Sequence, residues 1–397
     1  MTNTILVDTL WEDFLPLTFT RPVAELRVGA LTIAEKWRHD LGSTISYHTK
    51  DYLQEMYPLQ IHEDNLLINS RLLPTEYLVE RVRRLQLGEA LQSKEGLWVA
   101  ARLGEAAATA FLAGQKDEDI VYRECAGDKL IVLLRPPDLF GVNFDEIERD
   151  FVRLTKGRET MDISSGNTVF GDQLFVEQGV EIRGAIIDAT RPVYIGRGAK
   201  VLPGSSLMGP LSIGEGSVVK MGAKIYGGTT IGPHCKAGGE INNAIMMGYS
   251  NKGHDGYLGN SVLGEWCNLG ADTNTSNLKN NYSEVRIWHY PTERFVATGK
   301  IFCGLIMGDH SKCGINTMFN TGTVVGVSAN IYGAGYQRNF IPSFSWGGPK
   351  GIRTYRLDKA LEVAGVVMKR RGKVLDPAMR HILENVFDRT EAFRPKG

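Results

Sequence analysis

The sequence lacks an excess of charge of either sign. Lysine and arginine together number 45, aspartate and glutamate also number 45, and the formal net charge at pH 7 is zero. A neutral chain has no overall field that attracts nucleic acid or an anionic membrane, so we expect neither as a partner. Any anionic ligand must then be held by a local group of cations.

Features of secreted, membrane and metal-binding proteins are also missing. The first residues contain no basic segment followed by an apolar run, and no stretch approaches the roughly 20 apolar residues of a membrane span. The five cysteines form no CxxC pair, which favours reduced thiols over a disulfide framework. No His/Cys cluster has the spacing of metal ligands, so no metal site is predicted. We therefore expect a cytoplasmic protein.

Glycine, by contrast, is abundant. There are 45 glycines, concentrated after residue 165, whereas helical patterns lie before residue 156 and after residue 346. A chain of 397 residues is too long for one ordinary core. We predict an α/β domain over 1–155, a polar linker over 156–168, a β domain over 169–346 and a helical tail over 347–397.

Apolar residues recur at every sixth position in the second half of the chain. Three frames, which begin at Ile195, Tyr257 and Met307, hold fifteen such positions, and all fifteen are apolar. The next residue is glycine in eight of them, and the residue four positions on is small in all but one. This repeat predicts a parallel β-helix in which each hexad forms a short strand and a corner, and three hexads close one coil.

The repeat also predicts where the β-helix is interrupted. Its frame breaks after Ile231 and after Leu269, so we expect loops near 237–256 and 276–304, where binding groups are commonly carried. The aromatic stretch 340–346 is expected to seal the last coil, because an open end would expose core and strand edges. The remaining interpretations are structural: Cys235, Cys267 and Cys313 as core, and His234 and His310 as surface residues.

Two segments near the first frame break carry a more specific pattern. They are His254-Asp255-Gly256-Tyr257-Leu258-Gly259 and Cys267-Asn268-Leu269-Gly270-Ala271, followed by Ser276-Asn277-Leu278. Together with GDHSKCGIN at 308–316, they resemble the bifunctional glucosamine-1-phosphate acetyltransferase/N-acetylglucosamine-1-phosphate uridylyltransferase family over about residues 165–335. The resemblance implies a left-handed β-helix that uses acetyl-CoA, and a homotrimer with the coenzyme between adjacent β-helices.

The resemblance also implies roles for individual residues. His254 would be the general base that takes a proton from the sugar amine, a task that suits histidine because its ordinary pKa is near neutrality. Glu240 would orient this histidine, and Asn277 would lie beside the reacting amine. The resemblance further implies that the sugar phosphate contacts Lys224, Asn242, Tyr257 and Asn268. Acetyl-CoA would contact Ala271 (through its N–H), Lys312, Gly314 and Gly333.

Two positions depart from the family pattern. Lys224 replaces an arginine and Asn242 replaces a lysine, so one charge for the sugar phosphate is missing. Lys252 and Lys279 are the candidates to replace it. Structural interpretations stay open, since Tyr257 is the apolar residue of its own hexad. The segment 369–371 (KRR) either contacts the coenzyme's 3′-phosphate from a neighbouring subunit or lies on a solvated helix face.

Residues 1–155 resemble a sugar nucleotidyltransferase more weakly. The segment 16–22 (PLTFTRP) and the helical pattern after Leu31 are similar to the start of that fold. However, residues 8–15 contain no glycine to cradle a triphosphate, and Ser70-Arg71 stands where the metal-binding Gly-Asp would be. One set of candidates for a different anion pocket remains: Arg21, Arg27 and Arg71. UTP and Mg²⁺ are expected only if this degenerate domain is active.

The sequence as a whole favours an acetyl-CoA-dependent N-acetyltransferase of the hexapeptide-repeat superfamily. Its acceptor would be an amino-sugar phosphate similar to glucosamine 1-phosphate, with formation of UDP-N-acetylglucosamine by the N-terminal domain as an open second activity. Two alternatives stay open. One is a sugar-1-phosphate nucleotidyltransferase whose β-helix only oligomerises or regulates, and the other is a non-catalytic trimer that binds a sugar nucleotide.

Overall fold

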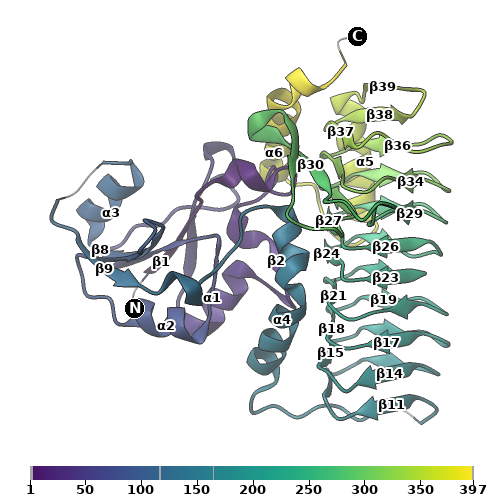
Figure 1. Ribbon diagram of the computed structural model, residues 1–397, viewed down its shortest axis with the longest axis horizontal. Helices are drawn as coiled ribbons and strands as arrows, with labels where there is room; N and C mark the ends of the chain where they lie inside the picture. The colour runs from purple at the N-terminus through teal and green to yellow at the C-terminus, as the bar shows by residue number, and fades with distance from the viewer. Residues whose placement is uncertain (1–2, 116–117, 164, 396–397) are drawn as a thin grey trace. The chain divides into compact units, whose positions relative to one another are not determined.

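The computed structural model describes residues 3–115, 118–163 and 165–395. The chain divides into two compact units (Figure 1). The first consists of Met1–Phe14, Arg21–Leu26 and Leu31–Leu134, and the second of Leu15–Thr20, Arg27–Ala30 and Arg135–Gly397. This division differs from the expected boundary at 155, because helix α4 (Pro136–Thr155) packs with the β-helix.

The first unit is built on a mixed six-stranded sheet. Strand β1 (Asn3–Val7) lies between β4 (Ile45–His48) and β5 (Asn65–Asn69) and is parallel to both. The sheet continues through β8 (Trp98–Leu103), β7 (Glu89–Ser93) and β9 (Val121–Cys125). The chain thus crosses from one side of β1 to the other. In doubly wound folds, ligands bind at the carboxyl ends of the strands next to such a reversal.

Local signals in the sequence set the helices of this unit. Helix α1 (Ile33–Leu41) begins after Thr32, whose hydroxyl accepts from the Glu35 N–H (3.1 Å) while the Glu35 carboxylate accepts from the Thr32 N–H (2.6 Å). It ends at Gly42, which has a φ of +67° that favours glycine. Two shorter helices follow, α2 (Glu76–Arg83) and α3 (Glu105–Leu112).

The second unit is a parallel β-helix with three sheets, as the hexad repeat predicted, and it is left-handed, as the family resemblance implied (Figure 1). The first sheet contains β11 (Thr168–Gly171), β14 (Ile186–Ala189), β17 (Ser206–Met208), β20 (Lys224–Ile225), β23 (Glu240–Asn242) and β26 (Tyr257–Gly259). The second contains β12 (Leu174–Val176), β15 (Val193–Ile195), β18 (Leu211–Ile213), β21 (Thr229–Ile231), β24 (Ile245–Gly248), β27 (Val262–Glu265), β32 (Leu305–Met307), β35 (Thr323–Val325) and β37 (Phe340–Ile341). The third contains β13 (Glu181–Ile182), β16 (Lys200–Val201), β19 (Val218–Val219), β22 (Lys236–Ala237), β25 (Asn251–Lys252), β28 (Asn268–Leu269), β33 (Lys312–Cys313), β36 (Asn330–Ile331), β38 (Ser345–Gly348) and β39 (Gly351–Thr354).

The apolar residue of each hexad points into the coil. Ile195, Ile213 and Ile231 stack in register on the second sheet, and each is 0% exposed. All five cysteines are buried and free, which confirms the interpretation of Cys235, Cys267 and Cys313 as core residues. His310, in contrast, is 4% exposed, so its interpretation as a surface residue is wrong. Its ring continues a stack with Tyr249 and Trp266 at the corner after the second sheet.

The first frame break is not a projecting loop. The coil continues through 237–256 as β23, β24 and β25, and its corners are shorter, so that Lys236 pairs with Asn251 only 15 residues on. As a result Leu258 is the inward residue of its strand (0% exposed), and Tyr257 lies on the outer face. The second break does hold an insertion, the hairpin of β30 (Arg286–His289) and β31 (Arg294–Ala297).

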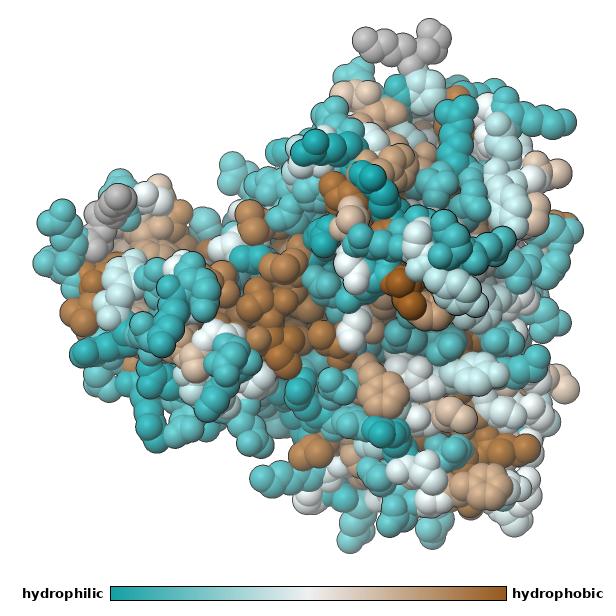
Figure 2. Space-filling model, in the orientation of Figure 1, coloured by the Kyte–Doolittle hydropathy of each residue, from teal (hydrophilic) through white to brown (hydrophobic). Residues whose placement is uncertain are grey.

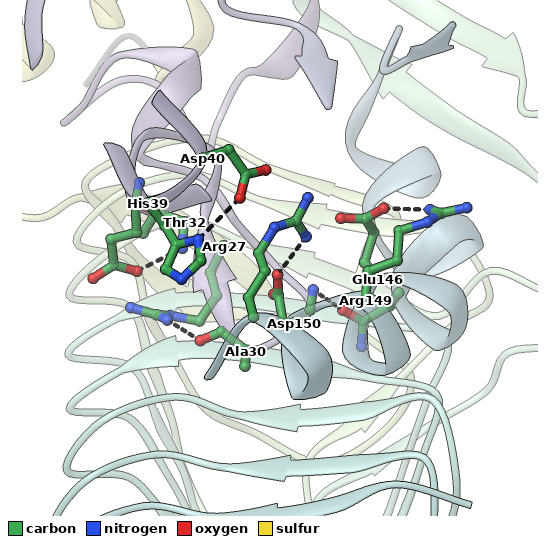
Figure 3. A network of polar contacts seen from close by, with 12 residues as sticks. Arg27, Ala30, Thr32, His39, Asp40, Glu146, Arg149 and Asp150 are labelled. Carbon is green, nitrogen blue, oxygen red and sulfur yellow. Dashed lines mark hydrogen bonds and ion pairs between the residues drawn. The ribbon is translucent and has the colours of Figure 1, made fainter. Parts of the chain in front are cut away.

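Helix α4 lies against the second sheet. The Asn143 amide donates to the Gly228 carbonyl (2.7 Å) and to the Thr230 hydroxyl (3.0 Å), and its oxygen accepts from the Gly29 N–H (2.6 Å). Figure 3 shows the neighbouring charged groups of α4, where the buried Glu146 carboxylate pairs with Arg149. A Cβ atom at Gly29 would lie 2.4 Å from the Asp150 carboxylate, so the segment requires glycine there.

The tail contains the predicted helices, α5 (Leu357–Lys369) and α6 (Pro377–Arg389). The stretch 340–346 does not simply seal the β-helix, because it forms β37 and the start of β38 and so adds a further coil. Phe344 is buried there and meets Phe387 of α6 edge to face at 5.0 Å. Within the described residues, no helix has the length and apolar character needed to cross a bilayer.

Candidate functional site

His254 occupies the corner between the third and first sheets. It lies between β25 and β26, and its side chain is exposed. Gly256 closes this corner with a φ of +107°, and a Cβ atom there would lie 2.2 Å from the Thr273 carbonyl oxygen of the next coil. The corner therefore holds the histidine outward on a backbone that only glycine can complete.

A buried lysine ties down the same corner. The Lys252 ammonium donates to the carbonyls of His254 (2.5 Å), Asp255 (3.0 Å) and Gly238 (3.2 Å), and the residue is 1% exposed. Burial lowers the pKa of this ammonium to about 8, against the opposing effect of Asp255 and Asp272. Lys252 therefore does not supply the missing sugar-phosphate charge, because its three donors are already directed at main-chain acceptors.

On the outer face of the first sheet, several predicted residues come together. The Asn277 amide donates to the Tyr257 phenol oxygen (3.1 Å) and to the Asn260 side-chain oxygen (2.8 Å). Burial raises the pKa of Tyr257, a side-chain hydrogen bond from Asn277 opposes the rise, and Glu240 adds to it. Because a Cβ atom at Gly259 would lie 2.3 Å from this phenol oxygen, glycine makes the room for the ring.

Glu240 and Lys224 belong to the same face. Lys224, Glu240 and Tyr257 pair in register on β20, β23 and β26, so their side chains form one outward column. Lys224 is exposed and Glu240 is half-buried. Among the described residues, no hydrogen bond joins Glu240 to the His254 ring. The predicted orienting role of Glu240 therefore stays a prediction.

On the third-sheet side, His254 lines a cavity of about 740 Å³ that is rich in cations. Five cationic side chains line it, and no carboxylate does: Lys220, Lys236, Lys312, Arg370 and Arg371. Arg371 follows α5 and donates to the Asn251 side-chain oxygen (2.9 Å). Asn268 also lines this cavity, so two of the predicted ligand residues, Asn268 and Lys312, share it with the histidine.

The titration of the cavity lysines reflects this crowding. Burial lowers the pKa of Lys236, and the neighbouring charges of Arg371, Lys220 and Arg370 lower it further. Burial also lowers the pKa of Lys312 to about 8, and its ammonium donates to the His310 carbonyl (2.7 Å). Like charges gathered without an acidic partner raise the energy of the unliganded cavity, and a bound anion would relieve it.

A smaller cavity of about 460 Å³ lies on the other side of the histidine. His254, Asp255, Ala271 and Asp272 line it, together with Lys220, which therefore borders both cavities. The remaining predicted residues lie elsewhere. Lys279 donates to the Glu284 carbonyl (2.7 Å), Gly314 stacks over Gly270 in the next coil, and Gly333 is exposed with a φ of +111°.

Sequence reasoning missed the contribution of Lys220 and Lys236 and left the basic end of α5 undecided. A signal for Lys236 was present, because it precedes an inward residue just as Asn251, Asn268 and Lys312 do on the same sheet. The positions of Arg370 and Arg371 could not be read from the sequence. They depend on how the tail returns over the β-helix.

In the first unit, the carboxyl ends of the three parallel strands meet at Asp8. Its carboxylate accepts from the Thr49 hydroxyl (2.6 Å), the Ser70 hydroxyl (2.8 Å) and the Val23 N–H (3.0 Å). Burial raises the pKa of Asp8 to about 6. The glycine-free segment after it forms a short 3-10 helix, Trp11–Phe14, so no glycine-rich loop follows β1.

The three arginines predicted to form an anion pocket in the N-terminal domain instead interact with other groups of the chain. Arg71 is 4% exposed, donates to the Thr9 hydroxyl (2.9 Å) and has a pKa lowered by burial. Arg21 is 5% exposed; burial raises the pKa of the neighbouring Glu25 carboxyl, and the charge of Arg21 opposes that rise. Arg27 belongs to the second unit, where it donates to the carbonyls of Met247 (3.1 Å) and Ala30 (Figure 3).

Known proteins resemble both parts of the chain. A family model described as Sugar nucleotidyl transferase matches residues 4–159. The Bifunctional protein GlmU of Methanocaldococcus jannaschii is 36% identical over 87 residues, which are 22% of this chain and 21% of that protein, so the chain matches about a fifth of that relative's length. The Uncharacterized acetyltransferase YaiX of Escherichia coli is 32% identical over 159 residues, which are 39% of this chain and 68% of that protein. The solved UDP-N-acetylglucosamine acyltransferase of Arabidopsis covers 53% of this chain and 80% of its own at 19% identity, with a TM-score of 0.24.

The comparisons match both a nucleotidyltransferase family model and a named acetyltransferase. The sugar nucleotidyl transferase family occupies the start of the chain, and the match to the Escherichia coli acetyltransferase spans more than two thirds of that protein. The chain therefore belongs to the GlmU-like family, in which a sugar nucleotidyltransferase-type domain is fused to a β-helix of acetyltransferase type.

Proposed function

We propose that the chain is an acetyl-CoA-dependent N-acetyltransferase whose acceptor is an amino-sugar phosphate similar to glucosamine 1-phosphate. The position of His254 carries the proposal. Its exposed ring lies between the outer face that holds Tyr257 and the cation-lined cavity. A sugar with hydroxyl and amine groups suits the first environment, and phosphate groups suit the second.

In the proposed reaction, the acceptor nitrogen attacks the thioester carbonyl carbon. A C–N bond forms, the C–S bond breaks, and the coenzyme leaves as a thiol. His254 takes the proton from the nitrogen and returns it to the leaving sulfur, so protons balance. Asn277, held by Tyr257, is placed to orient the acceptor amine, and the Ala271 N–H is the candidate donor to the developing oxyanion.

Charge for the acceptor phosphate has a candidate source. Asn242 stands where the family has a lysine and carries no charge, and Lys252 is buried. Lys220, however, lines both cavities that meet at His254. Lys224 supplies a second exposed cation on the first sheet. We therefore assign the acceptor phosphate to Lys220 and Lys224 in place of the cation that Asn242 lacks.

We also propose that the chain forms a homotrimer. Large apolar side chains on the first strands of the first sheet face solvent: Phe170 is 55% exposed, Ile186 is 51% and Met208 is 45%. Apolar side chains are visible among the polar ones at this end of the β-helix in Figure 2. An exposed apolar strip on a rigid sheet is typical of a subunit interface. Sedimentation equilibrium at micromolar concentration tests the oligomer.

Replacement of His254 by alanine tests the enzymatic proposal. We expect acetyl transfer to glucosamine 1-phosphate to fall by about two orders of magnitude or more, because a general base commonly contributes that much. His62→Ala, which changes an exposed histidine of the first unit, is the matched control and should keep full activity. If His254→Ala is as active as the wild type, the assignment of His254 as the base is refuted.

A sugar-1-phosphate nucleotidyltransferase is the second candidate, favoured by the family match over residues 4–159. Pyrophosphate release from UTP, Mg²⁺ and N-acetylglucosamine 1-phosphate, unchanged in His254→Ala, would support it. We expect no such release. The Asp8 carboxylate already receives three hydrogen bonds from the chain, and no glycine-rich loop follows β1 to bind a triphosphate.

A further inference from the structure

Three asparagine side chains form a chain of hydrogen bonds that ends at the acceptor face. The Asn277 amide nitrogen donates to the Asn260 side-chain oxygen (2.8 Å) and to the Tyr257 phenol oxygen (3.1 Å). The Asn260 amide nitrogen donates to the Asn243 side-chain oxygen (2.9 Å), and the Asn243 nitrogen donates to the Phe140 carbonyl of α4 (2.9 Å). We call these three asparagines the asparagine ladder. It joins successive coils and is anchored in helix α4.

The backbone alone does not account for two of these asparagines. Asn243 and Asn260 precede strands β24 and β27, at corners where their φ angles are +47° and +45°. Asparagine tolerates this left-handed conformation, but glycine adopts it more readily. Glycines instead make room for the amides. A Cβ atom at Gly228 would lie 2.9 Å from the Asn243 amide, and one at Gly259 would lie 2.7 Å from the Asn277 amide nitrogen.

The ladder runs in one direction, and this direction fixes which atom Asn277 presents to a ligand. Each amide nitrogen donates to the oxygen of the next amide, and the last one donates to a main-chain carbonyl, which can only accept. Reversal of a single amide would bring two oxygens or two nitrogens together. Because the Asn277 nitrogen directs its hydrogens at Asn260 and Tyr257, its oxygen is the atom left for a ligand.

We propose that Asn243 and Asn260 are positioning residues, which hold the Asn277 amide with its oxygen toward the acceptor amine. This inference rests on the proposed acetyl transfer and adds two residues to it. An attacking amine must keep its lone pair free. The amide oxygen accepts an N–H of the amine and leaves the lone pair free, whereas the amide nitrogen would donate to the lone pair and block the attack. The amine nitrogen gains positive charge in the transition state, which strengthens its hydrogen bond to the oxygen.

Two variants of Asn260 separate the role of the amide from that of the backbone. Asn260→Gly keeps the left-handed corner and removes the amide, whereas Asn260→Asp keeps an oxygen that accepts from the Asn277 nitrogen. With glucosamine 1-phosphate as acceptor, we expect kcat to fall about tenfold in Asn260→Gly, which is the scale of one lost hydrogen bond. Asn260→Asp should stay within about threefold of wild type, and the KM for acetyl-CoA should stay within about twofold in both variants.

Asn243→Gly tests the ladder one step further from the amine. Its kcat should fall only about twofold to threefold, because Asn260 keeps its own bond to Asn277. Asn339→Gly is the matched control, since its amide donates to the Thr321 carbonyl (2.8 Å) before strand β37 and lies outside the ladder. It should keep the wild-type kcat. Equal losses in Asn260→Gly and Asn260→Asp, no loss in Asn260→Gly, or a larger loss in Asn243→Gly would each overturn the inference.

Hydrogen exchange of the side-chain amides tests the ladder without turnover. In protein labelled with ¹⁵N-asparagine, the Asn277 amide protons should exchange slowly in wild type and in Asn260→Asp, and at least about tenfold faster in Asn260→Gly. Fast exchange in wild type contradicts the inference. An active wild type with an equally active Asn260→Gly refutes the inference alone. If the wild type transfers no acetyl group to any amino-sugar 1-phosphate, the proposed function fails, and the role of the ladder at the amine fails with it.

Discussion

Lys252 offers the sharpest test of how the fold positions the candidate base. Lys252→Met keeps an unbranched side chain of nearly the same length and removes the ammonium. Three main-chain carbonyls then lose a donor, and two of them belong to His254 and Asp255. Because Lys252 is 1% exposed, water does not replace the lost donor without opening the corner.

Two opposing free energies set the size of the effect. Three hydrogen bonds from a charged donor contribute roughly 1.5–3 kcal/mol each, or about 4–9 kcal/mol in total. Removal of the ammonium also relieves the net effect of burial and the opposing acidic charges, which lowers the pKa from 10.5 to about 8 and corresponds to about 3 kcal/mol. The free energy of unfolding should therefore fall by about 1–6 kcal/mol. The kcat of acetyl transfer should fall by about tenfold or more, because the His254 main chain is no longer fixed.

Thermal unfolding and steady-state kinetics measure the two effects separately. Lys200→Met is the control, because this lysine lies on the same sheet but is exposed and, within the described part of the chain, forms an ion pair only with Glu181 (2.8 Å). Such a surface pair contributes less than about 1 kcal/mol. Wild-type stability in Lys252→Met would refute the reasoning on burial. A loss of stability with unchanged kcat would show that the lysine supports the coil but does not position His254.

Two further variants test the acceptor face and the first unit. Tyr257→Phe removes the phenol oxygen that the Asn277 amide contacts at 3.1 Å, so kcat/KM for the acceptor should fall by up to about tenfold while the KM for acetyl-CoA stays constant; the reverse pattern would place Tyr257 at the donor. Asp8 has a folded-state pKa of about 6, above its ordinary 3.8, so the wild type loses stability as pH rises from about 4 through 6. Asp8→Asn removes this charge, and denaturation curves should show it more stable than wild type at pH 7, by up to about 3 kcal/mol, and equal near pH 4. An advantage that does not depend on pH would contradict this account.

The fold could be predicted from the sequence wherever a repeat governs it. The hexads fixed the stacked coils, and the apolar spacing fixed the tail helices, because burial of one residue per strand is a local requirement. The same reading failed at the first frame break. A frame shift has two causes, an inserted loop or a shortened corner, and the apolar spacing alone does not separate them. Leu258 rather than Tyr257 points inward for the second reason.

The candidate site could be predicted only in part, because some of its contacts join neighbouring coils and others depend on tertiary packing. The family resemblance gave Tyr257 and Asn277 separate roles, which stay predictions, and the structure adds that the two side chains meet, since both lie within two neighbouring coils. Lys252 was misjudged, because an outward phosphate ligand and a buried lysine with three carbonyl partners look identical in a sequence. Arg370 and Arg371 were undecided because their cavity joins residues more than 100 positions apart, and such a contact depends on tertiary packing.

The irregular coils themselves explain why a site exists at this place. In a regular solenoid every corner is equivalent, and earlier strands of the third sheet do repeat every 18 residues, from Lys200 to Val218 to Lys236. The next intervals are 15 and 17, to Asn251 and Asn268. The shortening lies in the steps from Lys236 to Glu240 and from Glu240 to Ile245, in the coil before His254. It shifts the frame of the coils that follow, in which Tyr257 faces outward next to the corner that carries His254. The departure from the repeat thus gives the site its own geometry, while the flanking regular coils keep that geometry rigid.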